Sequence, residues 1–186
     1  MKIVPQKKTK KPTWSDVKHT IGGFDGSGLM EIIGDLYRLS RANRDFLHAR
    51  FSIGANPQKP YKKVIKESLY PDVMSNKPIR ISPAKQAISD YAKAVGDVNG
   101  VAELMVYFVE CGNQCTLDYG DIDEPFYDAL ISMYGRTLDR VLELPEQAQQ
   151  SFRERLHRIM TSSSGIGWGY HDALCDMYED AFPEED

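Results

Sequence analysis

The sequence contains only three cysteines among 186 residues, and it has no long apolar run. Its basic beginning, MKIVPQKKTKKPTW, is not followed by the apolar stretch of a signal peptide, and no later segment is apolar enough to span a membrane. An odd number of cysteines without a secretion signal does not predict a disulfide framework. We therefore expect a cytoplasmic protein in a reducing compartment, with no membrane partner.

Familiar catalytic motifs are also missing, including Gly-x-Ser-x-Gly, His-Glu-x-x-His and the kinase signatures. The stretch nearest to a phosphate-binding loop is SSSGIGWGYHDALCDMYED, residues 162–180. Its glycines at 165, 167 and 169 are spaced by two, and Tyr170 stands where a dinucleotide fingerprint has its third glycine. The segment before them is helical, whereas that fingerprint follows a strand, so a dinucleotide-binding loop is excluded. A Walker loop is excluded as well, because no Gly-Lys-Ser/Thr follows. We interpret the stretch as a joint between two helices, with a left-handed glycine cap and a turn that folds Ile166 and Trp168 onto the core.

Apolar residues are abundant enough for a packed core, at 41% hydrophobic and 10% aromatic. A domain of this length buries about 70% of the surface that its unfolded chain exposes. Residues 1–12 are rich in lysine and poor in apolar side chains, so we expect a flexible basic tail there. Residues 13–186 are expected to form a single helical domain.

Charge is distributed unevenly along the chain. Residues 1–93 hold 18 Lys and Arg against 8 Asp and Glu, whereas residues 94–186 hold 5 against 19. This polarity can steer an anionic partner to the first half, or pair one copy of the chain with another. It is equally consistent with two solvated faces of different composition.

Apolar periodicity, helix caps and prolines predict an all-α fold of about eight helices packed as antiparallel pairs. Thr13 is expected to cap the first helix. The second helix is long and is interrupted by a polar stretch at 40–45. Ser82 and Pro83 are expected to begin a later helix, which stops at Gly96. The short stretch 73–81 has some extended character but is too small to seed a sheet. The expected helices lie in residues 13–21, 29–51, 56–72, 83–95, 100–120, 121–144 and 146–160. The last one is expected at the end of the stretch 162–180, with an apolar side that runs from Tyr170 to Ala181.

Two groups of residues have the composition of metal sites. Cys111 with Cys115, and His171 with Cys175, are each four residues apart, as two zinc ligands on one helix would be. Small thiols beside an apolar face are ordinary core residues, however, so we expect no metal and no cofactor. The acidic stretch DYGDIDE lacks the spacing of a calcium loop, and we interpret it as acidic helix capping.

Six segments carry a resemblance to a known family: FLHARF, YKKVIKESLYPD, PAKQAISDYAKAVGD, LMVYFVE, DYGDIDEPFYDAL and SSGIGWGYHDAL. Together they resemble a family of bacterial proteins that is catalogued as a domain of unknown function. The resemblance runs from Trp14 to Phe182. It implies a small, cytoplasmic, all-helical bacterial protein, and it supplies no catalytic residue for this chain.

The sequence thus favours a non-enzymatic helical interaction module that binds a protein partner or itself. An alternative is a nucleic-acid-associated protein that uses the basic first half on phosphates. Its candidate contacts are Lys7, Lys8, Lys10, Lys11, Arg38, Arg41, Arg44, Lys62, Lys63 and Lys66. A further alternative is an enzyme with a polar site near His171, Asp172, Asp121 and Asp123.

Overall fold

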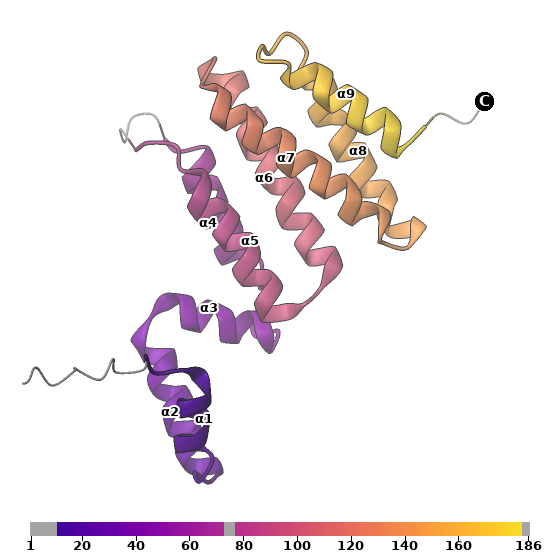
Figure 1. Cartoon of the computed structure of the whole chain (residues 1–186). Helices are drawn as coiled ribbons and strands as arrows, with labels where there is room; N and C mark the ends of the chain where they lie inside the picture. The colour runs from indigo at the N-terminus through magenta and orange to yellow at the C-terminus, as the bar shows by residue number, and fades with distance from the viewer. Residues whose placement is uncertain (1–10, 73–76, 184–186) are drawn as a thin grey trace, which may run out of the picture. The chain divides into compact units, whose positions relative to one another are not determined.

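The computed structural model describes residues 11–72 and 77–183, and within these residues the chain forms nine α-helices and no strand. The all-α prediction is therefore confirmed (Figure 1). The helices are α1 (Trp14–Ile21), α2 (Gly26–Leu39), α3 (Arg41–Arg50), α4 (Lys59–Leu69), α5 (Ile81–Val95), α6 (Val98–Tyr119), α7 (Glu124–Leu142), α8 (Glu146–Ser162) and α9 (Tyr170–Ala181). Contacts within the chain divide it into two compact units, Met1–Arg44 and Asp45–Asp186, which we call the N-terminal and C-terminal units.

The N-terminal unit contains α1, α2 and the first residues of α3. Thr13 begins α1 as predicted, and its backbone N–H donates to the carboxylate of Asp16 at 2.7 Å. The predicted long helix is broken at Ser40, whose backbone is extended and whose hydroxyl accepts a hydrogen bond from the N–H of Asn43. This break accounts for the helix beyond the expected eight. No residue of α1 or α2 is buried.

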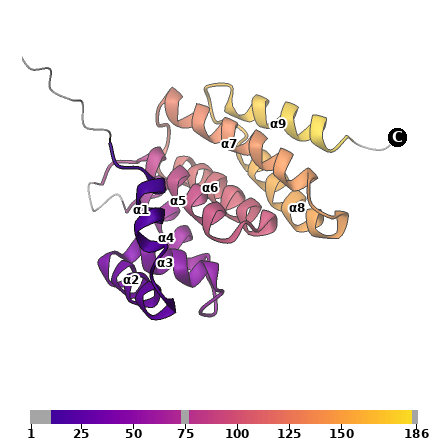
Figure 2. The same cartoon turned by 60° about the horizontal axis from the view of Figure 1, so that its bottom comes forward.

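In the C-terminal unit, α6 is the central helix. It contacts α4, α5, α7 and α8, and it lies between the α4–α5 pair and the group α7–α9 in both views (Figures 1 and 2). The twelve buried residues of α6 reflect this position. Gly112 lets α7 approach closely, because a Cβ at this position would collide with the side chain of Leu130. Tyr134 of α7 donates its hydroxyl to the backbone carbonyl of Leu156 on α8 at 3.1 Å.

Most helix ends follow the sequence signals. Asp123 caps α7 and Pro125 lies in its first turn, while Gly96 ends α5 in the left-handed conformation with φ of 68°. The predicted start of α5 was wrong by two residues. The helix begins at Ile81 after Arg80, because Pro83 is accommodated within the first turn, where a helix does not need its missing N–H. Of the stretch 73–81, residues 73–76 lie outside the described part of the chain.

The glycine-rich stretch is a joint between α8 and α9, as predicted. Gly165 and Gly169 are left-handed, with φ of 85° and 67°, although the residue that caps α8 is Ser163 in the right-handed region. Ile166 packs against the core. The expectation for Trp168 was wrong, since its side chain is 53% exposed. Its indole N–H is drawn outward to the carboxylate of Asp121, at 3.0 Å from each oxygen.

Candidate functional site

A groove in the C-terminal unit lies between α4, α6 and α8. It consists of two neighbouring pockets of about 700 Å³ and about 750 Å³. Lys66, Tyr70 and Tyr107 line both of them, so the two pockets share a wall. We call the first the α6–α8 pocket and the second the α4 pocket. Pockets of this size match those that hold small molecules in other proteins, roughly 300–1,000 Å³.

An ion-pair network holds the three helices of the groove together. Lys62 of α4 contacts Glu103 of α6 at 2.6 Å, and Arg155 of α8 contacts both Glu103 and Glu110. Burial alone would raise the pKa of Glu103, but the hydrogen bonds from Lys62 and Arg155 outweigh it and hold the pKa below its ordinary value of 4.5. Glu103 therefore stays ionised at neutral pH, and the network is fully formed.

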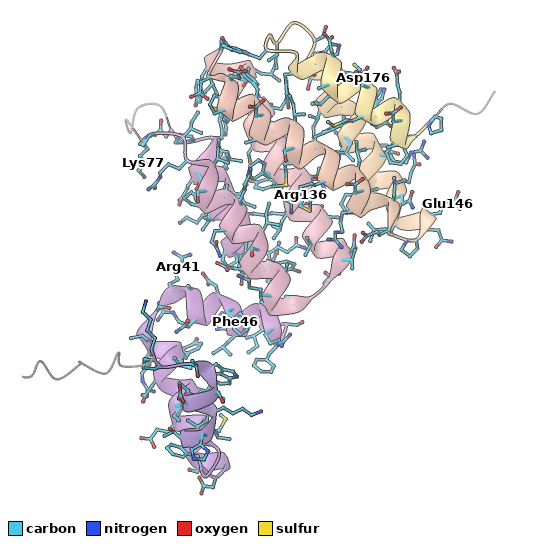
Figure 3. All side chains as sticks on the ribbon, viewed as in Figure 1. Arg41, Phe46, Lys77, Arg136, Glu146 and Asp176 are labelled. Atoms are coloured by element: carbon cyan, nitrogen blue, oxygen red, sulfur yellow. The ribbon has the colours of Figure 1, made fainter. Side chains whose placement is uncertain are left out.

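The α4 pocket is basic, although the unit that carries it is acidic. Residues 45–186 hold 14 Lys and Arg against 23 Asp and Glu. The lysines that line the α4 pocket are Lys59, Lys62, Lys63, Lys66 and Lys77, and the acidic residues there are Glu67 and Asp72. Lys77, in the segment that leads into α5, is labelled in Figure 3, as are Glu146 of α8 and Asp176 of the acidic helix α9. Such a concentration of one charge in a concave surface favours an anionic ligand.

Asn113 provides a polar group within the α6–α8 pocket. Its side chain is 4% exposed, and its Nδ2 donates to the hydroxyl of Ser162 at 2.9 Å. That hydroxyl donates in turn to the carbonyl of Ile159, so it has no proton to give back to Asn113. The amide oxygen Oδ1 of Asn113 has no partner among the described residues. A buried acceptor in this state is uncommon in a folded protein.

The remaining polar residues of the α6–α8 pocket suit binding better than covalent chemistry. Burial raises the pKa of the Cys111 thiol to about 11, so this thiol is protonated at neutral pH and is a poor nucleophile. Tyr70 donates its hydroxyl to Asp118, and Gln114 donates to the other oxygen of the same carboxylate at 2.8 Å. The acidic group at this edge of the groove is thus already satisfied.

A second candidate surface lies on the N-terminal unit. Leu29, Ile33 and Leu36 recur at helical spacing along α2, and all three are exposed. Further large apolar side chains of the unit are exposed as well, among them Leu39 at 77%, Trp14 at 69% and Met30 at 67%. We call this the α1–α2 apolar surface and define it by Trp14, Val17, Phe24, Leu29, Met30, Ile33, Leu36, Tyr37 and Leu39.

The residues predicted to contact nucleic acid are divided between the two units. Lys62, Lys63 and Lys66 lie together on α4 and line the groove. Lys11, Arg38, Arg41 and Arg44 belong to the N-terminal unit, while Lys7, Lys8 and Lys10 lie outside the described residues. Lys11 is exposed, and Arg38 forms an exposed ion pair with Asp35 at 2.5 Å.

The residues of the predicted enzyme site make structural contacts around the joint between α8 and α9. Asp121 accepts hydrogen bonds from Trp168 and Tyr127, and Asp123 caps α7. Nδ1 of His171 lies 3.0 Å from the hydroxyl of Ser163. The remaining residue, Asp172, is exposed in the first turn of α9.

The cysteines of the possible zinc set differ in burial. Cys111 and Cys115 are buried in the core, whereas Cys175 is partly exposed on α9. Across the described residues, no group of three or more His, Cys, Asp or Glu side chains has an arrangement that could hold a metal ion.

Sequence reasoning missed the residues that shape the groove. Asn113 was hidden among the apolar residues of α6, and Arg155 was one charged residue on a polar helix. A signal was present, since Glu103 and Glu110 are seven residues apart and therefore lie on one side of a helix that is otherwise largely buried. Two carboxylates on such a helix require cationic partners from its neighbours.

Comparison of the chain with family models, with curated proteins and with solved structures gave no match. The resemblance to a bacterial family stays a prediction. Among the described helices, none is both long and apolar enough to cross a membrane.

Proposed function

We propose that the protein is a helical interaction module whose α1–α2 apolar surface binds a protein partner or a second copy of the chain. One observation carries the proposal: α1 and α2 contain no buried residue, yet α2 bears an apolar stripe at helical spacing. Helices of 8 and 14 residues are marginal in water unless an apolar face is packed against something. Exposed apolar side chains along one face of a helix are typical of surfaces that bind another protein.

The geometry of α2 suits a helical partner. Leu29, Ile33 and Leu36 form the apolar side, while Glu31 and Arg38 lie on the opposite side of the helix. An amphipathic helix of this kind docks its apolar side into a groove or against another helix.

The test compares the two sides of α2 in the full-length chain. A photo-reactive amino acid is placed at Leu36 or, as the matched control, at Glu31, and the protein is irradiated in its host. We expect a covalent adduct of defined mass from position 36 and none from position 31. Mass spectrometry of the adduct distinguishes a second copy of this chain from another protein.

Sedimentation velocity supplies the second measurement. If the partner is a second copy, the mass rises with protein concentration, and the double substitution Ile33→Glu and Leu36→Glu abolishes that rise. The substitution Glu31→Gln leaves it unchanged. A chain that stays monomeric at every concentration, and that also gives equal or no adducts from positions 31 and 36, contradicts the proposal.

A further inference from the structure

The groove of the C-terminal unit offers a second site, which is independent of the α1–α2 apolar surface. We propose that the α6–α8 pocket binds a nucleotide, with the phosphate on Lys66 and Arg158 and an N–H donor of the base on Oδ1 of Asn113. The nucleotide is either free or part of a single strand. Three features of the pocket support this choice of ligand.

The first feature is a pair of available cations. Lys66 and Arg158 both line the pocket, and neither has a carboxylate within ion-pair distance among the described residues. Their neighbours Lys62 and Arg155 differ, because each is held by carboxylates of α6. Nε of Arg158 donates to the backbone carbonyl of Glu154 at 3.3 Å, which leaves its two terminal nitrogens to donate to a phosphate.

The carboxylate in the same pocket does not oppose an anion. Glu110 lines the pocket, but both of its oxygens accept hydrogen bonds from Arg155 at 2.7 Å. A bidentate pair of this kind neutralises the carboxylate locally and fixes it in place. The charge that remains for a ligand is therefore that of Lys66 and Arg158.

The second feature is the unpartnered oxygen of Asn113. An inorganic anion such as sulfate brings no donor to it, so an anion alone would leave this buried oxygen unsatisfied. A ligand that carries a negative group and an N–H or O–H group on the same molecule would satisfy both the cations and this oxygen. Nucleobases carry such donors at their edges, and an asparagine side chain is a common partner for them.

The third feature is aromatic. Tyr107 and Tyr70 line both pockets, and Nζ of Lys66 lies 5.8 Å from the ring centre of Tyr70. Side chains of this kind offer flat apolar faces beside positive charge, which is the combination that binds successive nucleotides in single-strand sites. Lys59 and Lys77 of the adjoining α4 pocket would contact the next phosphate of a strand.

The experiment measures binding to the full-length protein by isothermal titration calorimetry at low and at physiological salt. The probes are AMP, CMP, GMP and UMP, with inorganic phosphate for the anion alone and a short single-stranded oligonucleotide for the strand. We expect at least one nucleotide probe to bind more tightly than inorganic phosphate. Tighter binding of the oligonucleotide than of the mononucleotides assigns the site to a strand.

Substitutions in the pocket identify the contacts. Lys66→Gln and Arg158→Gln are surface changes and should each weaken binding about tenfold, as loss of a charge-assisted hydrogen bond does. Asn113→Ala should weaken nucleotide binding by a similar factor and leave the affinity for inorganic phosphate unchanged. Lys93→Gln and Arg136→Gln are the matched controls, because neither residue lines either pocket and both are exposed.

Thermal unfolding checks that each variant is folded. If Asn113→Ala does not fold, the binding data of Lys66→Gln and Arg158→Gln alone test the proposal. The proposal is overturned if no nucleotide probe binds, or if Lys66→Gln and Arg158→Gln bind as the controls do. It is also overturned if a folded Asn113→Ala protein binds nucleotides with unchanged affinity. That last result would reduce the groove to a phosphate-binding surface.

Discussion

Arg155 of α8 binds Glu110 of α6 through two parallel hydrogen bonds, Nε to Oε1 and Nη2 to Oε2, each 2.7 Å long. Its third nitrogen, Nη1, donates to Glu103, which lies two helical turns earlier on α6 and also contacts Lys62 of α4. A single guanidinium thus connects α8 to α6 and, through Glu103, to α4. The same side chain forms part of the wall of the α6–α8 pocket.

Replacing Arg155 by methionine should lower the free energy of unfolding by about 2–3 kcal/mol at neutral pH, because the partly buried carboxylate of Glu110 loses its partner and that of Glu103 keeps only Lys62. Urea denaturation followed by circular dichroism measures the change. The control is Arg136→Met, an exposed position on α7 (Figure 3), which should stay within about 0.5 kcal/mol of the wild type. Equal stability of the two variants would show that the network contributes nothing net.

The contribution of Arg155 should also depend on pH. The pKa of Glu103 is lowered in the folded protein, so its stabilising effect is present above the ordinary value of 4.5 and is lost as the pH falls through the lowered pKa. The difference in stability between wild type and Arg155→Met should therefore be constant near neutral pH and shrink below about pH 4.5. Urea titrations at a series of pH values test this, and a difference that grows toward acid would contradict it.

Two helical glycines should respond oppositely to alanine. At Gly112 of α6 a Cβ would collide with Leu130 of α7, so Gly112→Ala should destabilise the protein by about 1–3 kcal/mol. At Gly135 of α7 the Cβ would meet the flexible side chain of Met177, with its sulfur at 3.2 Å, and alanine is the better helix former. Gly135→Ala should therefore be neutral or stabilising in thermal denaturation. The reverse order would mean that α6 and α7 are not packed at Gly112.

The joint between α8 and α9 contains an internal control among its glycines. Gly165 and Gly169 have positive φ values, so alanine at either position should cost about 1 kcal/mol. Gly167 does not have a positive φ, and nothing lies within 4 Å of the Cβ that alanine would add. Gly167→Ala should leave the melting temperature nearly unchanged. Equal losses at all three positions would contradict the backbone conformation of the joint.

Local signals in the sequence were sufficient for much of the fold. Caps and prolines act within one helical turn, so Thr13 and Gly96 indicated helix ends correctly. Ser82 was less informative, because a proline fits at more than one position of a first turn. The grouping of contacts into two units was not visible in the sequence, since α3 runs continuously across residues 44 and 45 with no linker composition.

The groove could not be predicted because it depends on residues that are distant in the chain. Arg155 meets Glu110 across 45 residues, and Asn113 meets Ser162 across 49. Charge counting found the basic lysines of α4 but could not distinguish Lys62, which is paired with Glu103, from Lys66, which has no carboxylate partner among the described residues. That distinction depends on which helices pack together, and periodicity alone does not determine it.

The three cysteines should differ in reactivity. Burial raises the pKa of both Cys111 and Cys115 to about 11, and both side chains are enclosed in the core, so neither is available as thiolate near pH 8. Cys175 lies on α9 with its side chain partly exposed, and although burial also raises its pKa, a reagent can reach it. Titration of the native protein with a thiol-reactive disulfide should show one rapidly reacting cysteine, and Cys175→Ser should remove that phase.

Denaturant supplies the control for this last measurement, because unfolding should make all three thiols react at similar rates. Mass spectrometry of the partly labelled native protein locates the modified residue. Raising the pH should accelerate labelling of Cys175 first, since the two core thiols stay protonated to higher pH and react only when the surrounding helices open. Rapid labelling of Cys111 in the folded protein would show that the α6–α8 pocket exposes its thiol, and it would reopen the assignment of that pocket to binding alone.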